Sequence, residues 1–127
     1  MILAQFFGSV LGMLAVIFGA FGAHALKGKF SEEQLQSFET GVKYQMYHAI
    51  VLLAIGFTAP QTWLFTVVTW LFFLGVLLFS FSIYLLCYTG YKGNKWKFLG
   101  PVTPLGGLLL VVAWGMIAYG AFSLLLI

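Results

Sequence analysis

The sequence predicts an all-α integral membrane protein with four transmembrane helices and a short amphipathic helix between the first and the second. Hydrophobic residues make up 62% of the 127 residues, and only 7% are charged. All six lysines and all three glutamates fall into two windows, residues 27–43 and 92–97. A charge at the centre of a bilayer is costly, so long uncharged stretches between charge clusters indicate membrane crossings. We treat residues 1–127 as one transmembrane domain.

The first transmembrane helix is expected at residues 2–26, which is long enough to cross a hydrocarbon core of about 30 Å at about 1.5 Å per residue. Small residues recur along it at intervals of three or four, including Gly8, Gly12 and Gly19. In lipid, such a stripe allows a neighbouring backbone to approach closely, because helix association there depends on packing. We therefore expect these glycines to form a helix-packing face.

Residues 31–43 have the pattern of an amphipathic helix at the membrane surface. Ser31 and Gln34 have the spacing of a capping box, which fixes the start of a helix. Glu39 and Lys43 are four residues apart in the order that favours an ion pair on one helix face. Apolar residues follow a second stripe at helical spacing, so this segment is expected to lie on the bilayer before it continues or bends into the next helix.

The second and third transmembrane helices are expected at residues 44–59 and 62–89. Pro60 ends the first of them, and Thr62 can cap the next. Since so few residues separate them, these two helices must form an antiparallel hairpin.

The fourth helix is expected at residues 104–126. Gly90 supplies a stop before the second lysine window, and Thr103 followed by Pro104 has the form of a helix start. Gly106 and Gly120 lie on one face of this helix, which we expect to be a second packing surface.

Four crossings place both charge windows on one side of the membrane. Because lysine-rich loops stay in the cytoplasm, we expect a plasma or bacterial inner membrane protein with cytoplasmic charged loops and both termini on the opposite side. The positive balance of +3 then reflects lysines beside membrane segments. The expected partners are membrane lipids, with a homo-oligomer or a larger membrane complex possible, and no nucleic acid.

A group of polar residues is predicted to gather beneath the charged side of the bundle. His24 ends the first helix, and His48 lies near the start of the predicted second helix, so the two are expected at similar depth. The third and fourth helices bring further hydroxyl groups to the same region. The candidate polar cluster comprises His24, Glu39, Lys43, Tyr44, Tyr47, His48, Ser80, Ser82, Tyr84 and Thr103.

Three interpretations of this cluster are open. Buried polar groups in lipid must find partners within the protein, so the cluster can be hydrogen bonding that holds the helices together. It can also be a small polar pocket for a lipid headgroup, a solute or a proton. A metal site made of His24, His48 and Glu39 is the third. We expect no enzyme and no cofactor, because nucleophile motifs, phosphate-binding glycine loops and paired intramembrane carboxylates are lacking.

Five motifs occur in order along the chain and together carry a family resemblance. They are Gly19-Ala20-Phe21-Gly22-Ala23-His24, Glu39-Thr40-Gly41, Tyr44-Gln45-Met46-Tyr47-His48-Ala49, Phe79-Ser80-Phe81-Ser82-Ile83-Tyr84 and Thr103-Pro104-Leu105-Gly106-Gly107. The chain resembles the domain of unknown function 423 family of small four-helix membrane proteins, whose animal relatives are called transmembrane protein 256. One departure is Phe81, where the family more usually has glycine, which argues against close approach of another backbone at that turn.

The resemblance implies a membrane bundle and adds no substrate. The leading hypothesis is a non-enzymatic helical bundle that binds lipid or a membrane partner. One alternative is a small oligomeric transporter or channel with a histidine-containing polar site. The other is a metal-binding or enzymatic site at the two histidines.

Overall fold

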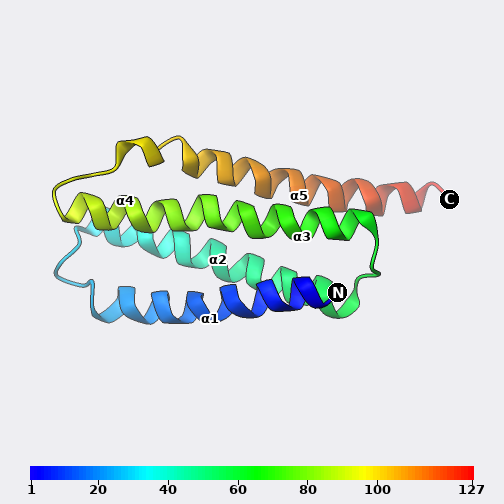
Figure 1. Ribbon diagram of the computed structural model, residues 1–127, viewed down its shortest axis with the longest axis horizontal. Coiled ribbons are helices and arrows are strands. Elements are labelled where there is room, and N and C mark those ends of the chain that lie inside the picture. The colour runs from blue at the N-terminus through cyan, green and yellow to red at the C-terminus, as the bar shows by residue number, and fades with distance from the viewer.

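The computed structural model describes residues 1–127, and its elements are all helices, with one isolated bridge between Lys27 and Phe30 and no β-sheet. Its elements in chain order are α1 (Ile2–His24), α2 (Glu32–Thr58), α3 (Trp63–Val76), the π-helix η1 (Leu77–Phe81), α4 (Ser82–Tyr91), the short 3₁₀ helix η2 (Lys97–Leu99) and α5 (Val102–Leu125). The α3, η1 and α4 elements follow one another without a break and form one long rod (Figure 1).

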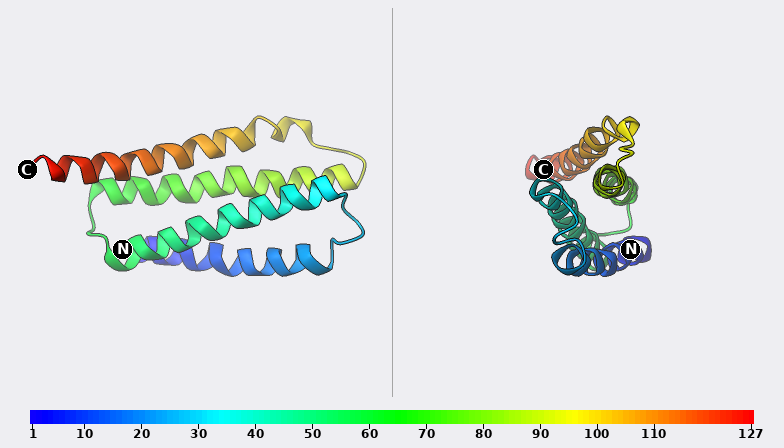
Figure 2. Two further views of the ribbon diagram at one scale, coloured as in Figure 1. Left: turned by 180° about the vertical axis from the view of Figure 1, so that it is seen from behind. Right: turned by 90° about the vertical axis from the view of Figure 1, so that its left-hand side faces the viewer.

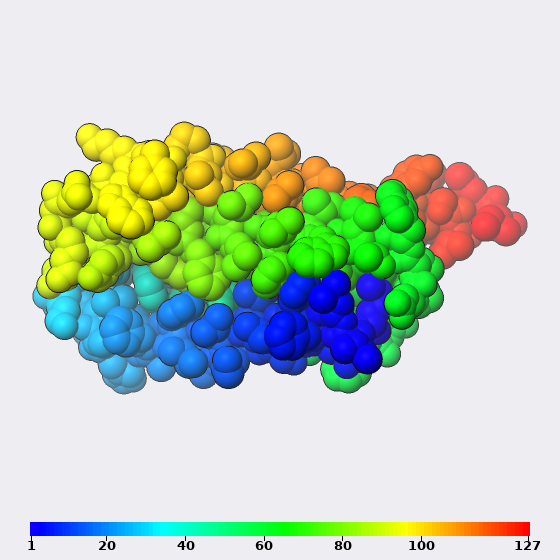
Figure 3. Space-filling model, in the orientation of Figure 1, coloured from blue at the N-terminus to red at the C-terminus, as the bar shows by residue number.

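The bundle consists of two helical hairpins that pack through one interface. The helix α1 lies against α2, and α5 lies against α3 and η1 (Figures 1 and 2). The two hairpins meet mainly where α2 contacts the rod of α3, η1 and α4, and side chains of α1 also pack against the rod. The last turns of α5 project beyond the other helices (Figure 3). Because helices α1 and α5 are at the edges of this arrangement, each leaves a broad apolar face exposed.

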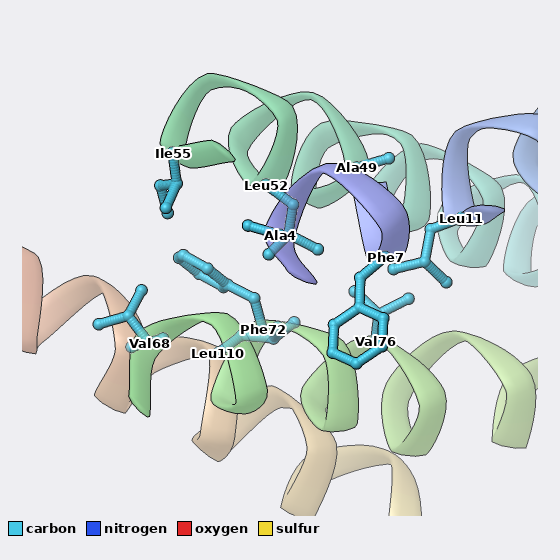
Figure 4. Packing of buried hydrophobic residues seen from close by; sticks show 11 residues of the cluster. Ala4, Phe7, Leu11, Ala49, Leu52, Ile55, Val68, Phe72, Val76 and Leu110 are labelled. Carbon is cyan, nitrogen blue, oxygen red and sulfur yellow. The ribbon is translucent and has the colours of Figure 1, made fainter. Parts of the chain in front are cut away.

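An apolar core fills the middle of the bundle. It contains eleven buried side chains from α1, α2, α3 and α5 (Figure 4). The largest of these that are completely buried are Phe72, Leu11 and Leu52. Three helical segments are long and apolar enough to cross a membrane: Ile2–His24, Trp63–Tyr91 and Lys97–Leu125.

The structure corrects the prediction of a separate amphipathic helix at residues 31–43. The predicted amphipathic segment and the predicted second helix, 44–59, form the single uninterrupted helix α2. The predicted capping box is confirmed, with both reciprocal hydrogen bonds between Ser31 and Gln34. The segment stands within the bundle because its apolar face packs there: the ring of Phe38 is buried against Tyr84. No proline occurs within residues 32–58, and Gly41 does not end the helix.

The turn between α2 and α3 is as predicted. Ala59 adopts an extended conformation before Pro60, which ends α2 at Thr58. Thr62 caps α3 by accepting a hydrogen bond from the backbone N–H of Phe65.

The ends of α4 and α5 differ from the prediction. The helix α4 continues through Gly90 to Tyr91, and Gly93 takes the left-handed conformation after it, with a φ of 82°. The helix α5 begins at Val102, so Thr103 and Pro104 lie in its first turn. Proline is tolerated there because the first backbone N–H groups of a helix have no partner within it.

The predicted packing glycines lie at helix contacts. A Cβ atom at Gly8 would stand 2.8 Å from the Ala49 carbonyl oxygen of α2. Gly12 and Gly19 also face α2, and Gly120 faces Leu64 of α3.

The closest helix approach occurs at the π-helix. A Cβ atom at Gly106 would stand 2.7 Å from the Leu78 carbonyl carbon and closer still to the Phe79 nitrogen. The backbone of α5 therefore contacts η1 at Leu78 and Phe79. The phenylalanine at position 81 had argued against a close approach in this turn. The ring of Phe81 packs elsewhere, against Phe18 and Tyr84.

Candidate functional site

His48 lies near the middle of the bundle. Its side chain is buried, and its Nδ1 atom is 2.7 Å from the Tyr44 carbonyl oxygen. The indole Nε1–H of Trp114 donates to His48 Nε2 at 3.2 Å. Since an indole nitrogen only donates, Nε2 is an acceptor, and the proton of a neutral imidazole is on Nδ1. Both ring nitrogens of His48 are therefore occupied by hydrogen bonds within the protein.

The two histidines are far apart, contrary to the expectation of similar depth. Ala49, the neighbour of His48, packs beside Gly12 at the middle of α1. His24 is exposed at the end of α1, twelve residues beyond Gly12, which is about 18 Å along a helix axis. The physical reason is that α2 begins at Glu32, so His48 lies well inside the helix. The two imidazoles cannot share a metal ion or a pocket.

No group of three or more His, Cys, Asp or Glu side chains is close enough to hold a metal ion. The proposed set of His24, His48 and Glu39 is therefore not assembled as a metal site. Glu39 forms an exposed ion pair with Lys43 at 3.2 Å.

A hydrogen-bonded chain joins three helices through Gln45, which the sequence analysis did not select. The Gln45 side chain is completely buried. Its Nε2 donates to the Leu11 carbonyl oxygen of α1 at 2.8 Å, and its Oε1 accepts from the Tyr84 hydroxyl of α4 at 2.7 Å. The ring of Tyr84 also covers Gly41, where a Cβ atom would stand 2.8 Å from it. Gln45 thus links the two hairpins.

The predicted serine and threonine residues make separate contacts. The Ser80 hydroxyl donates to the Gly41 carbonyl oxygen of α2 at 2.7 Å. Ser82 and Thr103 share a hydrogen bond of 2.5 Å between α4 and α5. No buried side-chain nitrogen or oxygen lacks a partner.

Tyr44 and Tyr47 are exposed on the outer surface of α2. The Tyr44 ring lies 4.9 Å from the Phe79 ring of η1, measured between centroids. The predicted polar residues are thus divided among several local contacts and do not converge on one pocket.

A groove between α1 and α2 opens at the charged end of the bundle. Its volume is about 510 Å³. Its apolar lining includes Phe38 and Val42, and three charged residues, Lys27, Glu39 and Lys43, line it as well. An apolar groove with a charged rim suits a molecule that is itself apolar with a charged end.

A second cavity, of about 500 Å³, lies between the start of α2, the end of α4 and the start of α5. Of the predicted polar cluster, only Thr103 lines it. Glu33 and Lys95 line it from different segments. The spacing of these residues in the sequence carries no signal for this cavity, because the long connection before α5 brings them together.

Comparisons with known proteins all identify the same family of membrane proteins. The family described as "Protein of unknown function (DUF423)" matches residues 18–107. The chain is 42% identical over 121 residues to the UPF0382 membrane protein YwdK of Bacillus subtilis, covering 93% of this chain and 94% of that protein. It is 41% identical over 118 residues to the UPF0382 membrane protein SSP2132 of Staphylococcus saprophyticus, covering 92% and 94%. No solved structure matches the chain.

Proposed function

Because this chain belongs to the DUF423 family of membrane proteins of unknown function, we propose that it is a non-enzymatic bundle that crosses the membrane four times and binds phospholipid at its charged end. The observation that carries the proposal is the groove between α1 and α2, with its apolar lining and its lysines. The proposal has three parts: the number of crossings, the orientation and the ligand.

The direction of the helices supports four crossings. The helix α1 runs toward the charged end of the bundle, and α3 starts at the opposite end (Figure 1). If α1 and the rod from Trp63 to Tyr91 both cross the bilayer, the chain between them must cross in the other direction. The helix α2 is that chain, and its 27 residues extend about 40 Å, more than the hydrocarbon core requires.

The lysines support an orientation. Five of the six, all but Lys43, lie in the connections at the end of the bundle where α1 ends and α5 begins, and Lys43 lies in the half of α2 nearer to that end. By the positive-inside rule this end is cytoplasmic, so both termini are on the other side. A periplasmic reporter enzyme such as alkaline phosphatase should be active when fused after Ile127 and inactive when fused after Asn94. The reverse pattern would refute this orientation.

The groove supports a phospholipid ligand with net negative charge. Phe38 and Val42 offer an acyl chain an apolar surface beside the charged groups of the groove. With Lys27, Lys43 and Glu39, the lining of the groove carries a net charge of +1. Since Lys27 forms no ion pair within the protein, its ammonium group is available to a phosphate.

The packed core argues against an aqueous transport path through a single copy of the protein. The level of His48 is filled by Phe72 and other packed side chains, and both described cavities lie at the charged end. An aqueous path would need a different conformation or an oligomer axis.

Lipid retention measured by native mass spectrometry tests the headgroup contact. The protein is released from nanodiscs that contain equal amounts of phosphatidylglycerol and phosphatidylcholine. We expect wild type to retain phosphatidylglycerol preferentially, and Lys27→Gln with Lys43→Gln to lose that preference. Lys29→Gln is the matched control, because Lys29 is a neighbouring lysine that does not line the groove.

A filled groove tests the acyl-chain contact. Ala23 lines the groove, whereas Ala20 is exposed on the same helix and does not line it. Ala23→Phe should reduce the retained lipid, and Ala20→Phe should not. Equal retention by both variants would contradict lipid binding in this groove.

A further inference from the structure

The second cavity has a different charge arrangement from the groove between α1 and α2. Glu33 enters it from the first turn of α2, and Lys95 enters it from the connection between α4 and α5. The two side chains form no ion pair with each other or with any other residue. One positive and one negative group therefore line the same cavity, and each is free to bind a group of opposite charge.

The uncharged lining divides into a polar and an apolar part. Ser37 lines the cavity from α2, and Thr103, whose hydroxyl is hydrogen-bonded to Ser82, lines it from α5. Ile83 and Leu86 contribute apolar surface from α4. The cavity thus lies where the apolar part of the bundle meets the charged loops.

The volume of about 500 Å³ is within the range of about 300–1,000 Å³ that small-molecule sites occupy. A complementary ligand has an ammonium group that pairs with Glu33, an anionic group that pairs with Lys95, and an oxygen that accepts a hydrogen bond from the Ser37 hydroxyl. A phosphate supplies both the negative charge and the acceptor oxygens.

We propose that this cavity binds a primary amine and a phosphate carried on one short linker, which is the chemistry of phosphoethanolamine. The ligand is either the headgroup of phosphatidylethanolamine, with its chains leaving along Ile83 and Leu86, or a water-soluble phosphoethanolamine. A choline headgroup fits less well, because its three methyl groups leave no N–H to donate to the Glu33 carboxylate. The site is independent of the groove between α1 and α2, whose lysines select net negative charge.

The test compares headgroups in phosphatidylcholine nanodiscs that hold the full-length protein. Phosphatidylethanolamine, its N,N,N-trimethylated form phosphatidylcholine and phosphatidylglycerol compete for retention, which native mass spectrometry measures. We expect Glu33→Gln to weaken phosphatidylethanolamine retention about tenfold and to remove its advantage over phosphatidylcholine. Lys95→Gln should weaken retention of both. A tenfold change corresponds to about 1.4 kcal/mol.

The neighbouring charges provide matched controls. Glu32 and Lys92 lie in the same two charge windows and do not line the cavity. Glu32→Gln and Lys92→Gln should therefore retain the wild-type preference. All four side chains are exposed, so the variants should fold, and their melting temperatures verify this.

A soluble arm distinguishes the two sources of the ligand. Glycerophosphoethanolamine is titrated into the same nanodiscs. Displacement of the lipid that depends on Glu33 and Lys95 supports a site for the free compound, and lipid retention that resists it supports the membrane lipid. Equal retention of phosphatidylethanolamine by wild type, Glu33→Gln and Lys95→Gln would overturn the proposal. So would an equal loss in the Glu32→Gln control. Neither result affects the phosphatidylglycerol measurement at Lys27 and Lys43.

Discussion

Replacement of Gln45 by methionine should destabilise the bundle without leaving a large cavity. Methionine is close to glutamine in volume and makes neither of its two hydrogen bonds, to the Leu11 carbonyl oxygen and from the Tyr84 hydroxyl. Interhelical hydrogen bonds in membrane proteins contribute about 0.6 kcal/mol on average and up to about 1.7 kcal/mol. Two of them, at a completely buried side chain, should therefore contribute between about 1 and 3 kcal/mol.

The assay is the free energy of unfolding in detergent or bicelles, measured for Gln45→Met, Tyr84→Phe and the double variant. Tyr84→Phe removes the hydroxyl that donates to Gln45 Oε1. Because both single changes break the same bond, the double variant should lose less stability than their sum, by about 0.6–1.7 kcal/mol. Unchanged stability in Gln45→Met, or a double variant whose loss of stability equals the sum of the two single losses, would refute the view that the hydrogen bonds of Gln45 hold the hairpins together.

Two further comparisons test the packing of the bundle. His48→Ala should lower the free energy of unfolding by about 2 kcal/mol or more, since it removes a buried ring and the partner of Trp114, whereas His24→Ala, at an exposed site, should change it by less than about 0.5 kcal/mol. Equal effects in a thermal melt would contradict the different depths of the two histidines. Gly106→Ala should lower the free energy of unfolding by about 1–3 kcal/mol, because the new Cβ meets backbone atoms of η1. Gly115→Ala has open space beside it and should be neutral or stabilising. A neutral Gly106→Ala would show that α5 does not approach the π-helix closely.

Local signals in the sequence predicted the helix ends well where a capping side chain or a proline marks the end. The capping box at Ser31, the proline at Pro60 and the cap at Thr62 all occupy their predicted places. The same reasoning failed where it divided α2. The amphipathic pattern of residues 31–43 predicted a helix on the bilayer surface that continues or bends into the next one; the segment continues as one helix within the bundle, and no proline interrupts residues 32–58.

That error explains the misplacement of the polar residues. The depth of His48 depends on where its helix begins, so a helix that starts at Glu32 moves it from near the surface to the middle. Gln45 and Trp114 were not selected because their roles depend on which side chains other helices present to them. The π-helix carries no sequence pattern that distinguishes it from an α-helix, and it lies where the chain packs against Gly106.

The central claim is that phospholipid occupies the groove between α1 and α2 at the charged end. A high-resolution structure of the protein in a membrane that contains phosphatidylglycerol tests this most directly. We expect continuous density for an acyl chain along Phe38 and Val42, with a phosphate within hydrogen-bonding distance of Lys27 or Lys43. A groove that is closed by its own side chains, or a lipid phosphate bound away from both lysines, would contradict the claim.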